Sequence, residues 1–135
     1  MAAQNRIPEI EGWVSHELSK VQLPLAEVPR LKQLAEATED YEERSRALME
    51  IAFVLMKALH HDEASRIAER IPSHHKKAAA LIAIAILDRQ TERIEAAQDA
   101  ISELAVDAGF SALSFGYIKL AAALSGLSGK PAATH

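Results

Sequence analysis

The segments ALMEIA (47–52) and ALIAIA (80–85) decide the fold, because they repeat one pattern of small and aliphatic residues 33 positions apart. A second set of small and aliphatic residues repeats with the same period: Ala64, Ala68 and Ile71 are matched by Ala97, Ile101 and Leu104. A fixed period of about 20 to 50 residues is typical of stacked supersecondary units, none of which can bury its apolar face alone. The sequence therefore predicts a repeat protein.

The composition indicates one soluble domain. The chain has 135 residues, of which 49% are hydrophobic and 25% charged, and this is enough for one packed core. The net charge of −4 argues against a nucleic-acid binder, because phosphate contacts require a basic surface. The chain has no cysteine, no N-terminal signal pattern and no apolar run longer than Ala78 to Leu87. We therefore expect a cytoplasmic protein that does not bind membranes.

Helix signals divide the chain into seven predicted helices. No glycine occurs between Gly12 and Gly109, and a glycine costs about 1 kcal/mol relative to alanine inside a helix. Asp40, Ser73 and Thr91 can cap helix N-termini. The predicted helices span about 8–20, 27–37, 41–59, 62–71, 74–88, 92–108 and 110–125. No stretch alternates apolar and polar residues for long, so the predicted fold class is all-α, with one domain over 1–126 and a flexible tail over 127–135.

The residues of each unit have the spacing of a known repeat family. Leu48, Ile51 and Ala52 are followed by Ala64 at the spacing found in the tetratricopeptide repeat (TPR), a helix–turn–helix unit of about 34 residues. The chain resembles a degenerate form of this family, because it lacks the family's tyrosine and proline, and a HEAT-like geometry stays open. Extending the period backwards gives a less regular unit around Leu18 and Leu31. The resemblance implies a short, right-handed α-solenoid of about three helix pairs and a C-terminal helix.

The resemblance also implies a concave surface, lined by the first helices of successive units, on which a protein partner binds. On this surface the chain would present an apolar lane with basic edges, which suits an extended or helical peptide that carries acidic groups. The residues predicted to bind the partner are Arg46, Met49, Phe53, Met56, Lys57, Ile82, Ile86, Arg89, Phe115 and Lys119. The alternative is that the apolar members of this set form an internal core, since such residues at helical spacing are commonly buried.

The last predicted helix, near residues 110–126, is unusually apolar for the end of a repeat array. A terminal unit normally presents a polar outer face to water, but Lys119 is the only charged residue from Ala108 to Gly129. Ala112 and Gly116 lie four residues apart and would let another helix approach closely. This segment predicts either a capping helix that packs inward or a contact with a partner or a second copy of the chain.

Histidines are the only obvious candidates for metal binding or acid–base chemistry. The pairs His60–His61 and His74–His75 lie at opposite ends of a predicted helix, about 15 Å apart along its axis, so they do not form one site. The sequence contains none of the phosphate-binding, dinucleotide-binding or hydrolase motifs. We therefore expect a protein that is not an enzyme and that binds no cofactor or metal.

The main functional hypothesis is a protein–protein interaction module, either an adaptor or a small chaperone-like carrier that holds a peptide or helix of its partner. One alternative is a helical bundle that binds a ligand or performs catalysis in an internal cavity, for example around His16 or Tyr117. The other alternative is a structural homo-oligomer joined through the apolar C-terminal helix.

Overall fold

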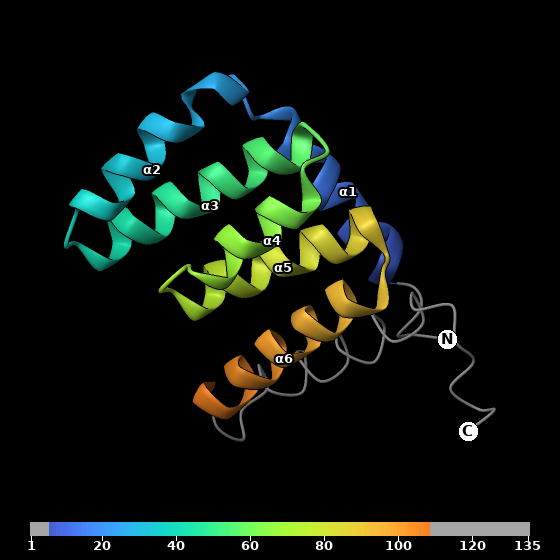
Figure 1. Cartoon of the computed structure of the whole chain (residues 1–135). Coiled ribbons are helices and arrows are strands. Elements are labelled where there is room, and N and C mark those ends of the chain that lie inside the picture. The colour runs from blue at the N-terminus through green and yellow to red at the C-terminus, as the bar shows by residue number, and fades with distance from the viewer. Residues whose placement is uncertain (1–5, 109–135) are drawn as a thin grey trace.

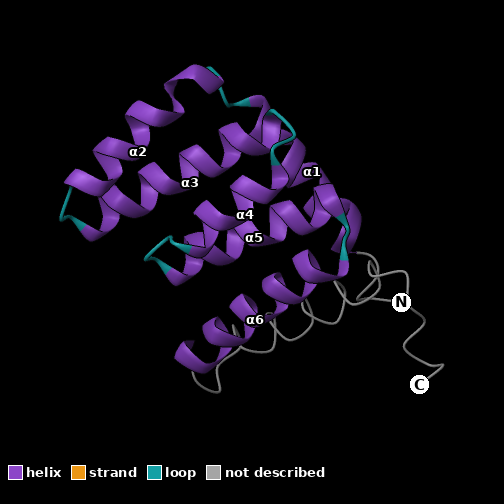
Figure 2. Ribbon diagram, in the orientation of Figure 1, coloured by secondary structure: helices purple, strands orange, loops and turns teal. Residues whose placement is uncertain are grey.

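The computed structural model describes residues 6–108, with side chains for residues 8–104, and every regular element within this part of the chain is helical (Figures 1 and 2). The helices are α1 (Arg6–Ser19), the short 3₁₀ helix η1 (Leu25–Glu27), α2 (Val28–Ala37), α3 (Tyr41–Lys57), α4 (His61–Glu69), α5 (His74–Asp88) and α6 (Thr91–Ala108). The prediction of an all-α protein is confirmed for these residues. The predicted helix at 110–125 and the tail lie outside the described residues.

Two capping residues, one repeat period apart, start α3 and α5. Asp40 Oδ1 accepts a hydrogen bond from the Glu43 N–H (2.9 Å), and Ser73 Oγ accepts one from the Lys76 N–H (3.3 Å). Each bond satisfies a backbone donor in the first turn, which the helix itself leaves unpaired. The capping prediction is confirmed for Asp40 and Ser73, whereas Thr91 is the first helical residue of α6 and not the residue before it. The helices α3 and α5 begin at the same point of the repeat.

From α2 to α6 each helix packs against the next one in the chain (Figure 1). The equivalent residues of the two repeat units are all buried in the core. They are Leu48 and Leu81, Ile51 and Ile84, Ala52 and Ala85, Ala64 and Ala97, Ala68 and Ile101, and Ile71 and Leu104. The alanines allow neighbouring helices to approach closely, because their side chains do not extend beyond Cβ. Residues that lie one period apart in the sequence are therefore buried alike.

The helix α1 does not follow this order of packing. It makes its main contacts with α5 and α3 and not with α2, the next helix in the chain. The connector from Lys20 to Pro24, which contains no helical residue, separates α1 from η1 and α2. The sequence suggested a less regular N-terminal unit that contains α1 and α2. These two helices do not pack against each other in the way that α3 packs against α4, or α5 against α6.

A buried hydroxyl joins the turn before α5 to α3. Ser45, which is fully buried on α3, accepts at Oγ a hydrogen bond from the Ser73 N–H (3.0 Å). The Tyr41 hydroxyl donates to the Pro72 carbonyl beside it (3.2 Å). Because Ser73 also caps α5, these bonds fix the start of α5 against the start of α3.

The C-terminal end of α3 contains a strained residue. Leu59 has a φ of 67°, in the left-handed region. The Leu59 N–H donates to the Met56 carbonyl (3.0 Å) and the His60 N–H to the Leu55 carbonyl (2.8 Å), which are the two bonds of a Schellman motif. Glycine usually occupies this position, because a Cβ atom is crowded there. The Leu59 side chain is 77% exposed, so packing does not offset the strain.

We expect Leu59→Gly to raise the free energy of unfolding by roughly 0.5 to 1 kcal/mol, because it relieves this backbone strain. Urea denaturation measures the change. The control is Leu59→Ala, which removes the exposed side chain but keeps Cβ, and it should stay within about 0.5 kcal/mol of the wild type. Equal stabilisation by both variants would show that the exposed side chain, and not the backbone, is the source of the strain.

An ion pair connects α2 to α4. Lys32 Nζ lies 2.8 Å from Glu63 Oε2, and both side chains are about one-third exposed. The hydrogen bond from Lys32 has the largest effect and lowers the pKa of Glu63 below its ordinary value of 4.5. Burial, the second-largest effect, raises the pKa, and the charges of Lys32, His60 and Arg66 each lower it further by a smaller amount. A lowered pKa in the folded state means that the pair adds stability above pH 4.5 and loses this contribution as the pH falls through the folded-state pKa.

We expect Glu63→Gln to lower the free energy of unfolding at pH 7 by less than about 1 kcal/mol, because the pair is exposed to solvent and screened. The difference from the wild type should shrink towards zero as the pH falls below 4.5. Urea denaturation at a series of pH values measures it. Glu39→Gln, at an exposed carboxylate that has no ion pair among the described side chains, is the matched control. If the stability difference between Glu63→Gln and the wild type grew towards acid pH, this would contradict a lowered pKa of Glu63 in the folded state.

Candidate functional site

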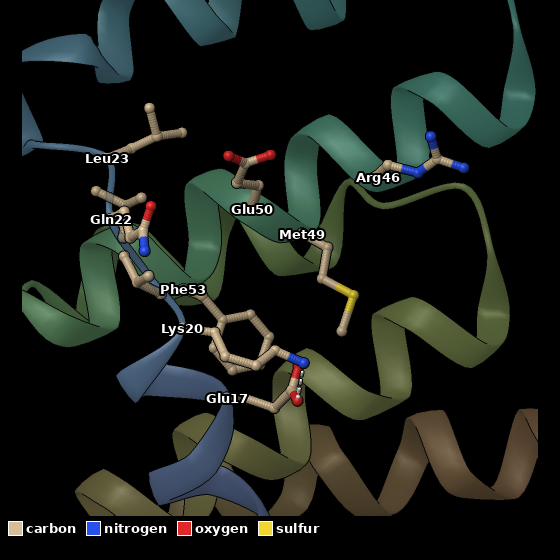
Figure 3. Close-up of a pocket in the computed structure, with 10 residues that line it drawn as sticks. Glu17, Lys20, Gln22, Leu23, Arg46, Met49, Glu50 and Phe53 are labelled. Carbon is tan, nitrogen blue, oxygen red and sulfur yellow. Dashed lines mark hydrogen bonds and ion pairs between the residues drawn. The ribbon is translucent and has the colours of Figure 1, made fainter.

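An open groove of about 830 Å³ lies on α3, beside the end of α1 and the connector that follows it (Figure 3). It is lined by Glu17, Lys20, Val21, Gln22, Leu23, Arg46, Met49, Glu50, Phe53 and Val54. The lining residues of α3 are spaced three and four positions apart, and this spacing places them on one face of the helix.

The floor of the groove is apolar. Phe53 and Val54 are buried, and Met49 is partly buried and packs against the core. Val21 and Leu23 from the connector are also partly buried against the same core. An apolar floor that contains a methionine can adapt to apolar side chains of different shapes, because the methionine side chain is flexible and polarizable.

The rim of the groove is charged on both sides. Arg46 and Glu50 are exposed on α3 and, among the described side chains, neither forms a hydrogen bond or an ion pair. Glu17 and Lys20 form an ion pair at 3.0 Å on the opposite side (Figure 3). The rim therefore offers one guanidinium and one carboxylate that are free to bind charged groups of a ligand.

Two contacts hold the walls of the groove in place. Lys57 Nζ donates a hydrogen bond to the Val21 carbonyl (2.9 Å), which fixes the connector to the end of α3. The Trp13 and Phe53 rings meet edge to face, with centroids 6.3 Å apart and an interplanar angle of 87°. Phe53 thus belongs both to the floor of the groove and to the surface that α1 covers.

The predicted binding residues fall into five groups. Arg46, Met49 and Phe53 line the groove, as the sequence suggested for a partner surface. Lys57 lies beside the groove and binds the connector. The side chains of Met56, Ile82 and Ile86 are 1%, 9% and 7% exposed and belong to the core, which was the alternative interpretation of the apolar residues. Arg89 forms an ion pair with Glu11. Phe115 and Lys119 lie outside the described residues.

Several residues of the groove were not among the predicted set: Glu17, Lys20, Val21, Gln22, Leu23, Glu50 and Val54. Glu50 could have been found, because it follows Arg46 by four residues and therefore shares its helix face. Lys20 lies one period before Phe53, so the repeat places it at the equivalent position. The other residues of α1 and the connector could not be found, because the repeat pattern does not determine where this segment packs.

Within the described residues no three potential ligands from His, Asp and Glu lie close enough to hold a metal ion. His74 Nδ1 lies 3.3 Å from Glu103 Oε2, and His16 is exposed and not in a closed cavity. No helix of the described part is long and apolar enough to cross a membrane.

The comparisons with known proteins give no family: no protein-family model, no curated protein and no solved structure matches the chain.

Proposed function

We propose that this protein is a cytoplasmic, TPR-like interaction module, an adaptor or small chaperone-like carrier, that holds a peptide or helix of a protein partner in the groove on α3. The consecutive packing of α2 to α6 supports a short α-solenoid, in which α3 and α5 are the first helices of two successive units. The observation that carries the proposal is the open groove with its apolar floor and its two unpaired rim charges.

The chemistry of the groove favours a peptide as its ligand. A volume of about 830 Å³ accommodates a few side chains. Apolar side chains of the peptide would replace water over Met49 and Phe53, and a carboxylate of the peptide would pair with Arg46. Glu50, one helical turn from Arg46, would favour a basic group at the next position and would thereby set the direction of the peptide.

Site-specific photo-crosslinking in cells that express the protein tests this proposal. A photoreactive residue at Glu50, on the rim, is compared with one at Gln33, which is exposed on α2 and does not line the groove. We expect one protein to be cross-linked from position 50 and not from position 33. Met49→Asp should reduce this cross-link at least tenfold, while Gln33→Asp leaves it unchanged, because only the first places a charge on the apolar floor.

Two results would overturn the proposal. One is the same pattern of cross-linked proteins from both positions. The other is the absence of any cross-link from position 50 together with a small molecule that is released from the purified protein on denaturation and detected by mass spectrometry. The second result would favour the alternative of a ligand-binding bundle. Circular dichroism of Met49→Asp establishes that the variant is folded.

A further inference from the structure

The helix α1 lies on the face that α3 and α5 share. It contacts both helices, although they belong to different units of the repeat and α4 separates them in the chain (Figure 1). α3 and α5 also contact each other directly, so their shared face is continuous. In the proposed architecture this is the concave face, where the partner of such an array would be expected to bind.

The contacts of α1 are those of a docked amphipathic helix. Val14 is buried, and Ile10 and Leu18 pack against the core on the same helix face, with Trp13 beside them. The Trp13 ring meets Phe53 of α3 edge to face. A charged contact fixes the orientation of the helix, because Glu11 forms an ion pair with Arg89 at the end of α5.

The sequence keeps α1 a weak helix. Gly12 lies in its middle, and a Cβ atom added at this position would meet no atom within 4 Å, so packing does not require a glycine there. Glycine lowers helix stability relative to alanine. A single helix of 14 residues is also marginally stable in water without its packing surface. Detachment of α1 from α3 and α5 therefore costs less than it would with an alanine at position 12.

We propose that the face of α3 and α5 beneath α1 is a helix-binding surface and that α1 is its exchangeable internal occupant. The partner is an amphipathic helix with the chemistry of α1. It carries an aromatic residue, an aliphatic residue directly after it, and a carboxylate two positions before it. This inference rests on the proposed function and identifies the partner segment. Phe53 connects the two surfaces, so a partner that replaces α1 can extend into the open groove.

Competition between α1 and the partner determines the observed affinity. A ligand that binds only when α1 has left has an apparent affinity reduced by the fraction of molecules in which the surface is free. Gly12→Ala stabilises the helical conformation of α1 without adding a contact. It should lower the fraction of molecules with a free surface about two- to fivefold. Trp13→Ala removes the contact with Phe53 and should raise the fraction by about tenfold or more.

The test uses the full chain and a fluorescent synthetic peptide of residues 6–20 as the probe, with fluorescence anisotropy as the measurement. We expect the peptide to bind the Trp13→Ala chain about tenfold more tightly than the wild type, and the Gly12→Ala chain about two- to fivefold more weakly. A peptide with Glu11→Arg should bind more weakly to all three chains, and Arg89→Glu in the chain should restore its binding.

If Trp13→Ala fails to fold, hydrogen exchange of the wild-type chain tests the inference without this variant. In the wild-type chain, the α1 amides should exchange through a local opening, faster than the core amides of α3 and α5. The inference is overturned if α1 exchanges only with global unfolding, or if peptide affinity does not differ among the three chains. A partner cross-linked from position 50 while α1 stays protected would leave the proposed function intact and refute only the exchange of α1.

Discussion

Truncation of either buried isoleucine of the repeat, Ile51→Ala or Ile84→Ala, is expected to lower the free energy of unfolding by about 2–5 kcal/mol. The two residues lie one period apart, on α3 and α5, and are 0% and 1% exposed. Each substitution removes apolar surface from the core and leaves a cavity that tightly packed neighbours fill only in part. Urea denaturation with an unchanged m-value measures the loss.

Leu34→Ala is the matched control, because Leu34 is half-exposed on α2 and its truncation should cost less than about 0.5 kcal/mol. If either alanine variant unfolds at room temperature, the corresponding valine variant should lose about 0.5 to 1.5 kcal/mol and still allow a comparison. A large loss at position 51 and a negligible one at position 84 would show that the two units do not have equivalent cores.

Most of the helical structure could be predicted from the sequence, because its causes are local. A capping side chain, a turn residue or a run without glycine acts within a few positions of the chain, as Asp40 and Ser73 do at the starts of α3 and α5. The repeat added long-range information, since a fixed period marks equivalent positions in two units. For that reason it predicts equivalent packing positions for Ala64 and Ala97, and both residues are fully buried.

The candidate site was predicted only in part, because it depends on where α1 lies. Arg46, Met49 and Phe53, which the repeat predicts to share a face, all line the groove, but the repeat carries no information on the segment that covers the rest of that face. Ile86 has the same helical spacing as Phe53 one unit earlier. Both side chains are buried, but only Phe53 lines the groove. The positions of Lys20 and Leu23 depend on the path of a connector that lies outside the regular units.

The strain at Leu59 could not be predicted from the sequence either. Nothing in the residue type indicates a left-handed conformation, for which glycine is the usual choice. The connection from α3 to α4 has three residues, and the two hydrogen bonds of the Schellman motif form within it. These backbone bonds accompany a conformation that the local preference of a leucine does not favour.

Enlarging the small residues at the helix contacts is expected to destabilise the protein as strongly as truncating the large ones. Ala64→Leu and Ala97→Leu each add three carbon atoms at a fully buried position, on α4 and α6, and protein interiors are close-packed. The added atoms must separate the helices or force strained rotamers, at a cost of about 3 kcal/mol for each variant.

Ala37→Leu, at an exposed position at the end of α2, is the matched control and should change the free energy of unfolding by less than about 0.5 kcal/mol. Because Ala64 and Ala97 lie one period apart, similar losses at both would show that the repeat fixes the distance between helices within each unit. A neutral Ala64→Leu, measured by urea denaturation, would mean that α3 and α4 can separate to accept the larger side chain. It would thereby contradict the close packing on which the structural interpretation of the repeat depends.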